Sequence, residues 1–104
     1  MPLTVVVENE RRTSRVSEFY DPHNVLTQLP ERAQKAGKTL RVLGYVDAYG
    51  DTTLNSLQQE AAIADVEDLN ELAKSADERE VLSKFRASLV AAMDEQHYVR
   101  IIGD

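Results

Sequence analysis

An apolar stripe between residues 77 and 96 constrains the fold of this chain more than any other feature. Its members recur at the three- and four-residue spacing of one helix face: Val81, Leu82, Phe85, Leu89, Ala92 and Met93. Asp77-Glu78-Arg79-Glu80 precedes the stripe as a D-x-x-E capping sequence, with Asp77 as the expected N-cap. The sequence therefore predicts a long helix whose apolar face must be covered by a second layer.

A second helix is predicted just before the first, and the phase of its apolar residues fixes its start. A helix from Thr53 would place Leu54 and Leu57 on a different face from the later apolar residues. With Ser56 as N-cap and Gln59 completing the capping box, one stripe results, and Glu60, Glu67 and Glu71 fall opposite it. Its members are Ala62, Ile63, Val66, Leu69 and Ala73. We expect a helix over 57–74, joined by Ser75-Ala76 to an antiparallel neighbour.

The rest of the chain is expected to supply strands and one shorter helix. Asp21-Pro22 is typical of a helix start, with Asp21 as N-cap, and Gly37 is typical of its end. Pro30 removes one backbone donor, so a kink or a restart of the helix is expected there. Strands are predicted over 3–7, 15–20, 39–47, 52–55 and 97–102, with a Gly50 hairpin turn at 47–51. The order ββαββααβ indicates an α+β domain with an antiparallel or mixed sheet of about five strands packed on helices.

Length and composition indicate one domain in a reducing compartment. The 104 residues are enough for one core, and no linker or repeat divides them into further domains. The chain has no cysteine, which excludes disulfides and thiolate metal sites. The N-terminal run is too short and lacks the basic residues of a signal peptide, and no stretch reaches the length of a membrane span. We expect a cytoplasmic protein that is not bound to a membrane.

The net charge of −6 is unevenly distributed along the sequence. Residues 1–41 carry seven basic and five acidic side chains, whereas residues 42–104 carry five basic and thirteen acidic ones. An acidic half repels phosphate backbones, so nucleic acid is not an expected partner, and a basic protein surface is. A solvated acidic face that only maintains solubility would give the same pattern.

Residue patterns typical of catalysis are missing from the sequence. His23 and His97 are far apart and have no metal-binding spacing, and the four glycines form no phosphate-binding loop. Asp47 and Asp51 flank the turn, and Asp21 and Glu60 could lie near them, but Tyr49 stands where a calcium loop needs an oxygen ligand. Turn formation explains the two aspartates better. We expect no metal, no cofactor and no enzymatic activity.

Polar and aromatic side chains gather around the predicted 47–51 turn. They are Tyr45, Tyr49, Asn55 and Gln58. A turn that presents such groups is suited to protein contacts, because loops often carry function and aromatic residues are enriched in interfaces. The same groups could equally form an internal network that fixes the hairpin to the following helix. The sequence leaves both interpretations open.

Residues 46–58 read V-D-A-Y-G-D-T-T-L-N-S-L-Q, which resembles a V-D-x-Y-G-D-T-x-x-N-x-L-Q pattern of small uncharacterised bacterial proteins. The resemblance implies no activity, but it implies an immunity- or antitoxin-like partner of another protein. Together with the charge, it favours a non-enzymatic inhibitor that binds a basic protein. The expected contacts are Asp47, Tyr49, Asp51, Glu60, Glu67 and Glu71.

Two other functions remain open on the sequence alone. One is a self-associating structural or regulatory module, in which strand 3–7 or 97–102 lies at a sheet edge and pairs with a second copy. The other is a small hydrolase or isomerase that uses Asp, His and Tyr side chains. It would require Asp47 or Asp51 to lie beside His23 or His97 in a deep pocket.

Overall fold

The computed structural model describes residues 3–9, 15–46 and 50–103, and it has the predicted α+β class. Among these residues the sheet has four strands, not about five. In chain order the elements are β1 Leu3–Glu8, β2 Arg15–Asp21, α1 Val25–Lys35, the 3₁₀ helix η1 Leu43–Tyr45, β3 Asp51–Leu54, α2 Ser56–Asn70, α3 Ala76–Glu95 and β4 Tyr98–Ile102.

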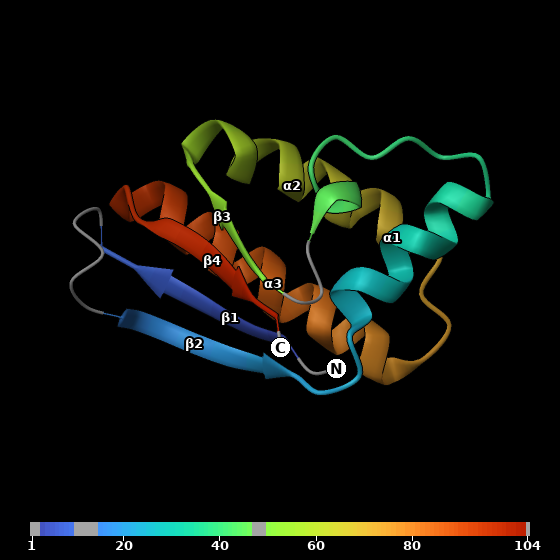
Figure 1. The fold of residues 1–104 in the computed structure, drawn as a ribbon, viewed down its shortest axis with the longest axis horizontal. Helices are drawn as coiled ribbons and strands as arrows, with labels where there is room; N and C mark the ends of the chain where they lie inside the picture. The colour runs from blue at the N-terminus through green and yellow to red at the C-terminus, as the bar shows by residue number, and fades with distance from the viewer. Residues whose placement is uncertain (1–2, 10–14, 47–49, 104) are drawn as a thin grey trace.

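The four strands are antiparallel and lie in the order β2-β1-β4-β3. The first and last strands of the chain are therefore the central pair, and β2 and β3 form the edges (Figure 1). The expectation that 3–7 or 97–102 lies at an edge is wrong. Val5, Val6 and Val7 are buried in succession, which agrees with the central place of β1 between two neighbouring strands.

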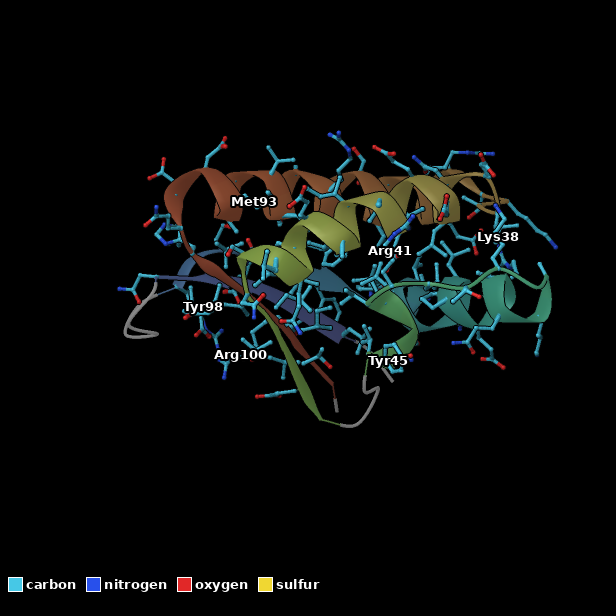
Figure 2. All side chains as sticks on the ribbon, turned by 90° about the horizontal axis from the view of Figure 1, so that it is seen from above. Lys38, Arg41, Tyr45, Met93, Tyr98 and Arg100 are labelled. Atoms are coloured by element: carbon cyan, nitrogen blue, oxygen red, sulfur yellow. The ribbon has the colours of Figure 1, made fainter. Side chains whose placement is uncertain are left out.

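Helices α2 and α3 lie side by side over one face of the sheet, and α1 lies beyond the strand ends against both helices (Figures 1 and 2). The core lies between the helices and the inward side chains of the strands. Alternate strand residues such as Val5, Val7, Val99 and Ile101 contribute to it. From α3 come Leu82, Phe85, Leu89 and Ala92, as the predicted stripe requires. In the described part of the chain, no helix covers the opposite face of the sheet.

Residues 39–46 do not form the predicted strand. Instead, they form an irregular segment that contains the short helix η1. Strand β3 pairs with β4, and not with residues 39–46 as the predicted hairpin requires. The physical reason is a side chain far along the sequence: the buried carboxylate of Asp65 accepts the backbone N–H groups of Arg41, Val42 and Leu43 at 2.9, 2.8 and 3.0 Å. These donors are satisfied without a neighbouring strand. Residues 47–49 of the predicted turn lie outside the described part.

The first helix begins at Val25, three residues after the predicted start at Pro22. Asp21 is not its N-cap; that position is Asn24, which has a left-handed backbone with φ of 54°. Asp21 is completely buried and its two oxygens accept the N–H groups of Val25 and Leu26, both at 3.0 Å. The Asp21 carboxylate therefore accepts the free N–H groups of the first helical turn from a position just before the N-cap. Pro30 lies within the helix, which continues through it to Lys35.

Both later helices are capped one or two residues before the predicted positions. Asn55 and Gln58 form the capping box of α2, with bonds of 3.0 Å in both directions, so Ser56 and Gln59 do not. The N-cap of α3 is Ser75, which accepts the N–H of Glu78 at 3.1 Å, and Asp77 lies inside the first turn. Helix α2 ends at Asn70, so residues 71–75 connect the antiparallel pair.

Candidate functional site

The predicted acidic face of α2 exists in the structure. Glu60, Glu67 and Glu71 are exposed at spacings of seven and four residues, which places them along one side of the helix. The side toward the core carries Gln59, Ala62, Asp65, Val66 and Leu69. Ile63, which was assigned to the buried stripe, is half-buried. The phase of the apolar residues thus orients three of the six predicted contacts correctly.

The uneven charge along the sequence is partly compensated in space. Cations from the N-terminal part of the chain reach the acidic helices: Lys38 Nζ lies 2.8 Å from Glu71 Oε2, and Arg41 Nη1 lies 3.3 Å from Asp65 Oδ1 and 3.5 Å from Asp68 Oδ2. The hydrogen bond from Lys38 lowers the pKa of Glu71, and the same bond raises the pKa of Lys38. Glu71 is therefore exposed but already has a cation.

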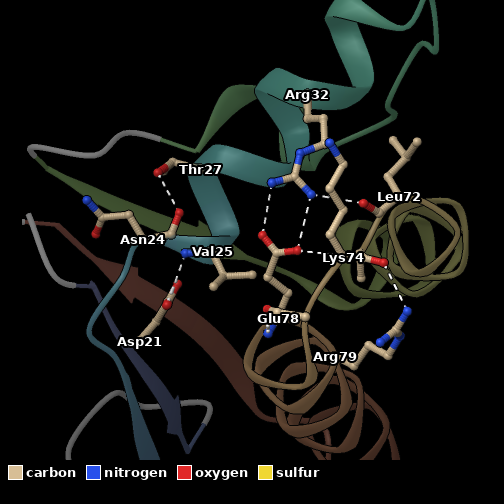
Figure 3. Close-up of polar contacts among 11 residues, drawn as sticks. Asp21, Asn24, Val25, Thr27, Arg32, Leu72, Lys74, Glu78 and Arg79 are labelled. Atoms are coloured by element: carbon tan, nitrogen blue, oxygen red, sulfur yellow. Dashed lines mark hydrogen bonds and ion pairs between the residues drawn. The ribbon is translucent and has the colours of Figure 1, made fainter.

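Arg32 on α1 fixes the connection between the two acidic helices (Figure 3). Its guanidinium binds both oxygens of Glu78, at 3.1 and 2.9 Å, and donates to the carbonyl of Leu72 at 2.9 Å. The Glu78 carboxylate also accepts the N–H of Lys74 at 2.7 Å. The hydrogen bond from Arg32 is the main reason that the pKa of Glu78 falls to about 2. The carboxylate of Glu78 therefore stabilises the fold and is not available to a partner.

Five exposed carboxylates of the helical pair have no ion-pair partner among the described residues. They are Glu60, Glu67, Asp77, Asp94 and Glu95. We call this set the acidic helical layer. Asp77 lies in the first turn of α3, where the helix dipole favours an anion. Asp94 and Glu95 stand at the opposite end, where the dipole disfavours a negative charge and the last turn has no basic residue.

Asp51 does not belong to this layer. It pairs with Ile102 across β3 and β4, whereas the neighbouring pair Thr52 and Ile101 points to the core, so Asp51 lies on the face of the sheet away from the helices. There it is 3.4 Å from Arg100 Nη1. The structure thus separates Asp51 from the three predicted glutamates of α2. The remaining predicted contacts, Asp47 and Tyr49, lie outside the described residues.

The open face of the sheet holds an ionic cluster that was not among the predicted sites. Arg100 Nη2 lies 2.6 Å from Glu8 Oε1, and Glu8 is buried. Arg100 and Tyr98 project away from α2 and α3 (Figure 2). Because Arg100 binds both Glu8 and Asp51, it links the central strand β1 to the edge strand β3. The sequence indicates this cluster only through the alternation of inward and outward side chains along a strand, which places Glu8 and Arg100 on the outward sides of β1 and β4.

The residues around the predicted turn have two different roles. Asn55 and Gln58 are used in the capping box, which favours the internal-network interpretation for this pair. Tyr45 is 79% exposed at the end of η1, which leaves its ring available for contacts. The sequence offered these as alternatives for the whole group, and the described members divide between them.

The structure does not bring the histidines together with Asp51. His97 precedes β4 at the end of the ladder where Leu54 pairs with Val99, whereas Asp51 pairs with Ile102 at the other end. His97 lines a polar hollow of about 370 Å³ with residues 55, 56, 93, 96 and 98. His23 is exposed and lines a separate hollow of about 310 Å³ beside Tyr20. Among the described residues, no three His, Asp or Glu side chains are grouped to hold a metal ion.

Comparison with known proteins gives no relative: no family model, curated protein or solved structure matches the chain. In the described part of the chain, no helix is long and apolar enough to cross a membrane. The functional assignment therefore depends on the charges and contacts described above.

Proposed function

We propose that this protein is a non-enzymatic binding module that engages a basic surface of another protein through the acidic helical layer. The sharpest form of the proposal is an inhibitor of the immunity or antitoxin type. The alternative, a self-associating module, would need a strand other than those predicted for it, because β1 and β4 form the centre of the sheet.

The observation that supports the proposal best is the selective pairing of charge. Lys38, Arg41 and Arg32 neutralise carboxylates that stabilise the fold, whereas Glu60 and Glu67 stay exposed with no cation among the described residues. Unpaired carboxylates at a helix C-terminus, such as Asp94 and Glu95, reduce stability by about 0.3–1 kcal/mol each. Residues that oppose local stability are expected where function requires them.

Electrostatic complementarity would act mainly on the rate of association. A surface with several unpaired carboxylates attracts a basic partner over distances up to the Debye length, about 8 Å at physiological salt. Such steering raises association rates by about 10-fold to 1,000-fold. Enzymes with anionic substrates have positive active sites, so an acidic module of this kind is suited to blocking a nuclease-like enzyme.

The test is affinity capture from native cells with two matched variants. The wild-type chain should retain one stoichiometric basic protein at low salt and lose it as salt rises. The double variant Glu60→Gln, Glu67→Gln removes two unpaired charges and should retain much less. As a control, Glu31→Gln with Glu80→Gln removes two charges that already have lysine partners, 3.2 Å away in both cases. Equal recovery by the two double variants, or no basic protein at low salt, would contradict the proposal.

A further inference from the structure

A polar hollow lies where α2 begins, α3 ends and β4 starts, near Met93 and Tyr98 in Figure 2. Its volume is about 370 Å³, which is within the usual range of ligand pockets. We call it the interhelical hollow, and it is lined by Asn55, Ser56, Met93, Gln96, His97 and Tyr98. These residues come from both helices and from β4, so the fold and not a single loop forms the hollow.

The carboxylates closest in sequence to the interhelical hollow are unpaired. Asp94 and Glu95 follow directly after Met93, and Glu60 lies four residues after Ser56, one helical turn into α2. All three carboxylates belong to the acidic helical layer and have no ion-pair partner among the described residues. The residues that line the hollow include no lysine or arginine. The surrounding charge therefore favours a cationic group.

The end of α3 adds negative partial charge at the same place. The N–H groups that follow the helix bind the carbonyls of Ala92 and Met93, which leaves those of Asp94 and Glu95 without an intrahelical donor. A cation at a helix C-terminus is favoured by these carbonyls and by the helix dipole. The opposite partial charge at the start of α2 is partly offset, because the Asn55 side chain accepts an N–H group of the first turn.

The interhelical hollow also has neutral acceptors on different elements. Ser56 carries a hydroxyl group and Gln96 a side-chain carbonyl. Nδ1 of His97 is buried and has no hydrogen-bond partner among the described residues. It is an acceptor when the neutral ring carries its proton on Nε2. A guanidinium has five N–H donors spread over a plane, whereas an ammonium has three at one point. Acceptors that lie on different elements therefore suit arginine better than lysine.

We propose that the interhelical hollow binds one arginine side chain of the basic partner protein. The inference rests on the proposed function, since the arginine belongs to that partner, and it names the group that anchors the partner. The guanidinium donates to acceptors at the end of α3 and to the Ser56 hydroxyl, and Asp94 and Glu95 supply the charge that attracts it. The aliphatic part of the arginine lies against the polarisable side chain of Met93.

Two other hollows in the described part of the chain fit this role less well, because each already contains a lysine. Lys38 lines a hollow between α1 and η1, and Lys84 lines the hollow that also contains His23. Lys38 lies 2.8 Å from Glu71, and Lys84 lies 3.2 Å from Glu80. An arginine that entered either hollow would compete with a resident cation, which the lining of the interhelical hollow does not contain.

The test is an NMR titration of the whole chain with N-acetyl-arginine methylamide at constant ionic strength. A single side chain binds weakly, so we expect a Kd of about 1–10 mM. The backbone amide signals of Ser56, Gln96 and His97 should shift in a saturable way. The matching citrulline compound has nearly the same shape without the charge and should give no saturable shift. The matching lysine compound should bind at least about threefold more weakly, because it has fewer donors.

Two double variants locate the site on the protein. Asp94→Asn with Glu95→Gln should weaken binding of the arginine compound by about threefold to tenfold, because the charge at the end of α3 is removed. Glu67→Gln with Asp77→Asn is the matched control, since it removes two unpaired carboxylates of the same layer that lie far along α2 and at the other end of α3. This control should bind like the wild type. Circular dichroism of both variants checks that the fold persists.

Four results would overturn the inference: no saturable shift with the arginine compound, an equal response to citrulline, an equal response to lysine, or equal affinity in the two double variants. The proposed function fails or stands separately. If a basic protein is captured through Glu60 and Glu67 but the arginine compound does not bind, the arginine anchor is wrong and the proposed function remains. If the arginine compound binds but no basic protein is captured, the partner is wrong and the guanidinium site remains.

Discussion

Arg32 and Glu78 form a two-point ion pair between α1 and the first turn of α3, with N–O distances of 3.1 and 2.9 Å. The two residues are 46 positions apart in the sequence. Their ion pair joins α1 to the pair of helices, α2 and α3, that covers the sheet. Because Arg32 also binds the carbonyl of Leu72, one side chain fixes both α3 and the connection before it.

The first prediction concerns acid stability. Because the pKa of Glu78 is lowered from 4.5 to about 2 in the folded chain, its contribution to stability is complete above pH 4.5 and is lost as the pH falls toward 2. We expect Glu78→Gln to lower the free energy of unfolding by about 1–2 kcal/mol at neutral pH. Urea unfolding from pH 7 to pH 2 measures the free energy of unfolding of the wild type and of Glu78→Gln. The difference between the two free energies should shrink below pH 4.5, and a difference that stays constant would contradict a lowered pKa of Glu78.

The second prediction concerns the carboxylate of Asp65. Asp65→Asn should reduce the free energy of unfolding by about 2–3 kcal/mol, because an amide cannot accept on both sides, and buried or partly buried N–H groups of residues 41–43 lose partners. Asp68→Asn is the matched control on the same helix and should change stability by less than about 0.5 kcal/mol, since its contact with Arg41 is exposed at 3.5 Å. Equal effects in the two variants would rule out this role for Asp65.

The irregular segment shows why the strand over 39–47 could not be excluded from the sequence. Leu40 and Leu43 are buried, as an apolar strand would have them. The backbone groups of this segment bind Asp65, more than 20 residues later in the sequence. Helical phase places Asp65 on the buried side of α2, but no local pattern indicates which backbone groups its carboxylate accepts. Long-range side-chain-to-backbone bonds of this kind leave no periodic signal.

The third prediction separates the two glutamines at the start of α2. Gln58→Ala removes half of an exposed capping box and should cost about 0.5–1 kcal/mol. Gln59→Ala should cost about 2–3 kcal/mol, because the buried amide bridges the carbonyls of Leu54 and His97, both at 2.9 Å. Thermal unfolding of the two variants compares them directly. A larger loss for Gln58→Ala than for Gln59→Ala would contradict the bridging role of the buried Gln59 amide.

The correct cap could have been found from helical phase. Gln59 lies three residues before Ala62 and seven before Val66, so it belongs to the buried stripe and cannot reach back to the helix start. Asn55 and Gln58 are the same pattern one residue earlier and fall on the solvent side. By contrast, α3 and β4 were predicted well because their apolar residues keep one period over the whole element.

The fourth prediction concerns the start of α1. Asp21→Ala should lower stability by about 1–2 kcal/mol, because the N–H groups of Val25 and Leu26 lose their acceptors at a buried helix end. Native-state hydrogen exchange should show faster exchange at these two amides than elsewhere in α1. Unchanged protection at Val25 and Leu26 would mean that another group satisfies them.

The candidate site could be predicted only in part. The orientation of Glu60, Glu67 and Glu71 followed from the period of α2, because exposure is a property of the helix face. The sequence does not indicate which carboxylates form ion pairs, because the fold brings Lys38 and Arg41 to them from another segment. Asp51 is a predicted contact because it flanks the 47–51 turn, but strand pairing places it on the face of the sheet away from the helices.

The most direct test of the acidic helical layer is the association rate with the captured basic partner, measured as a function of ionic strength. For the wild type we predict a rate that falls steeply as salt rises. The Glu60→Gln, Glu67→Gln variant should associate more slowly at low salt and depend less on it. Rates that coincide for the two proteins at every salt concentration would contradict the central claim.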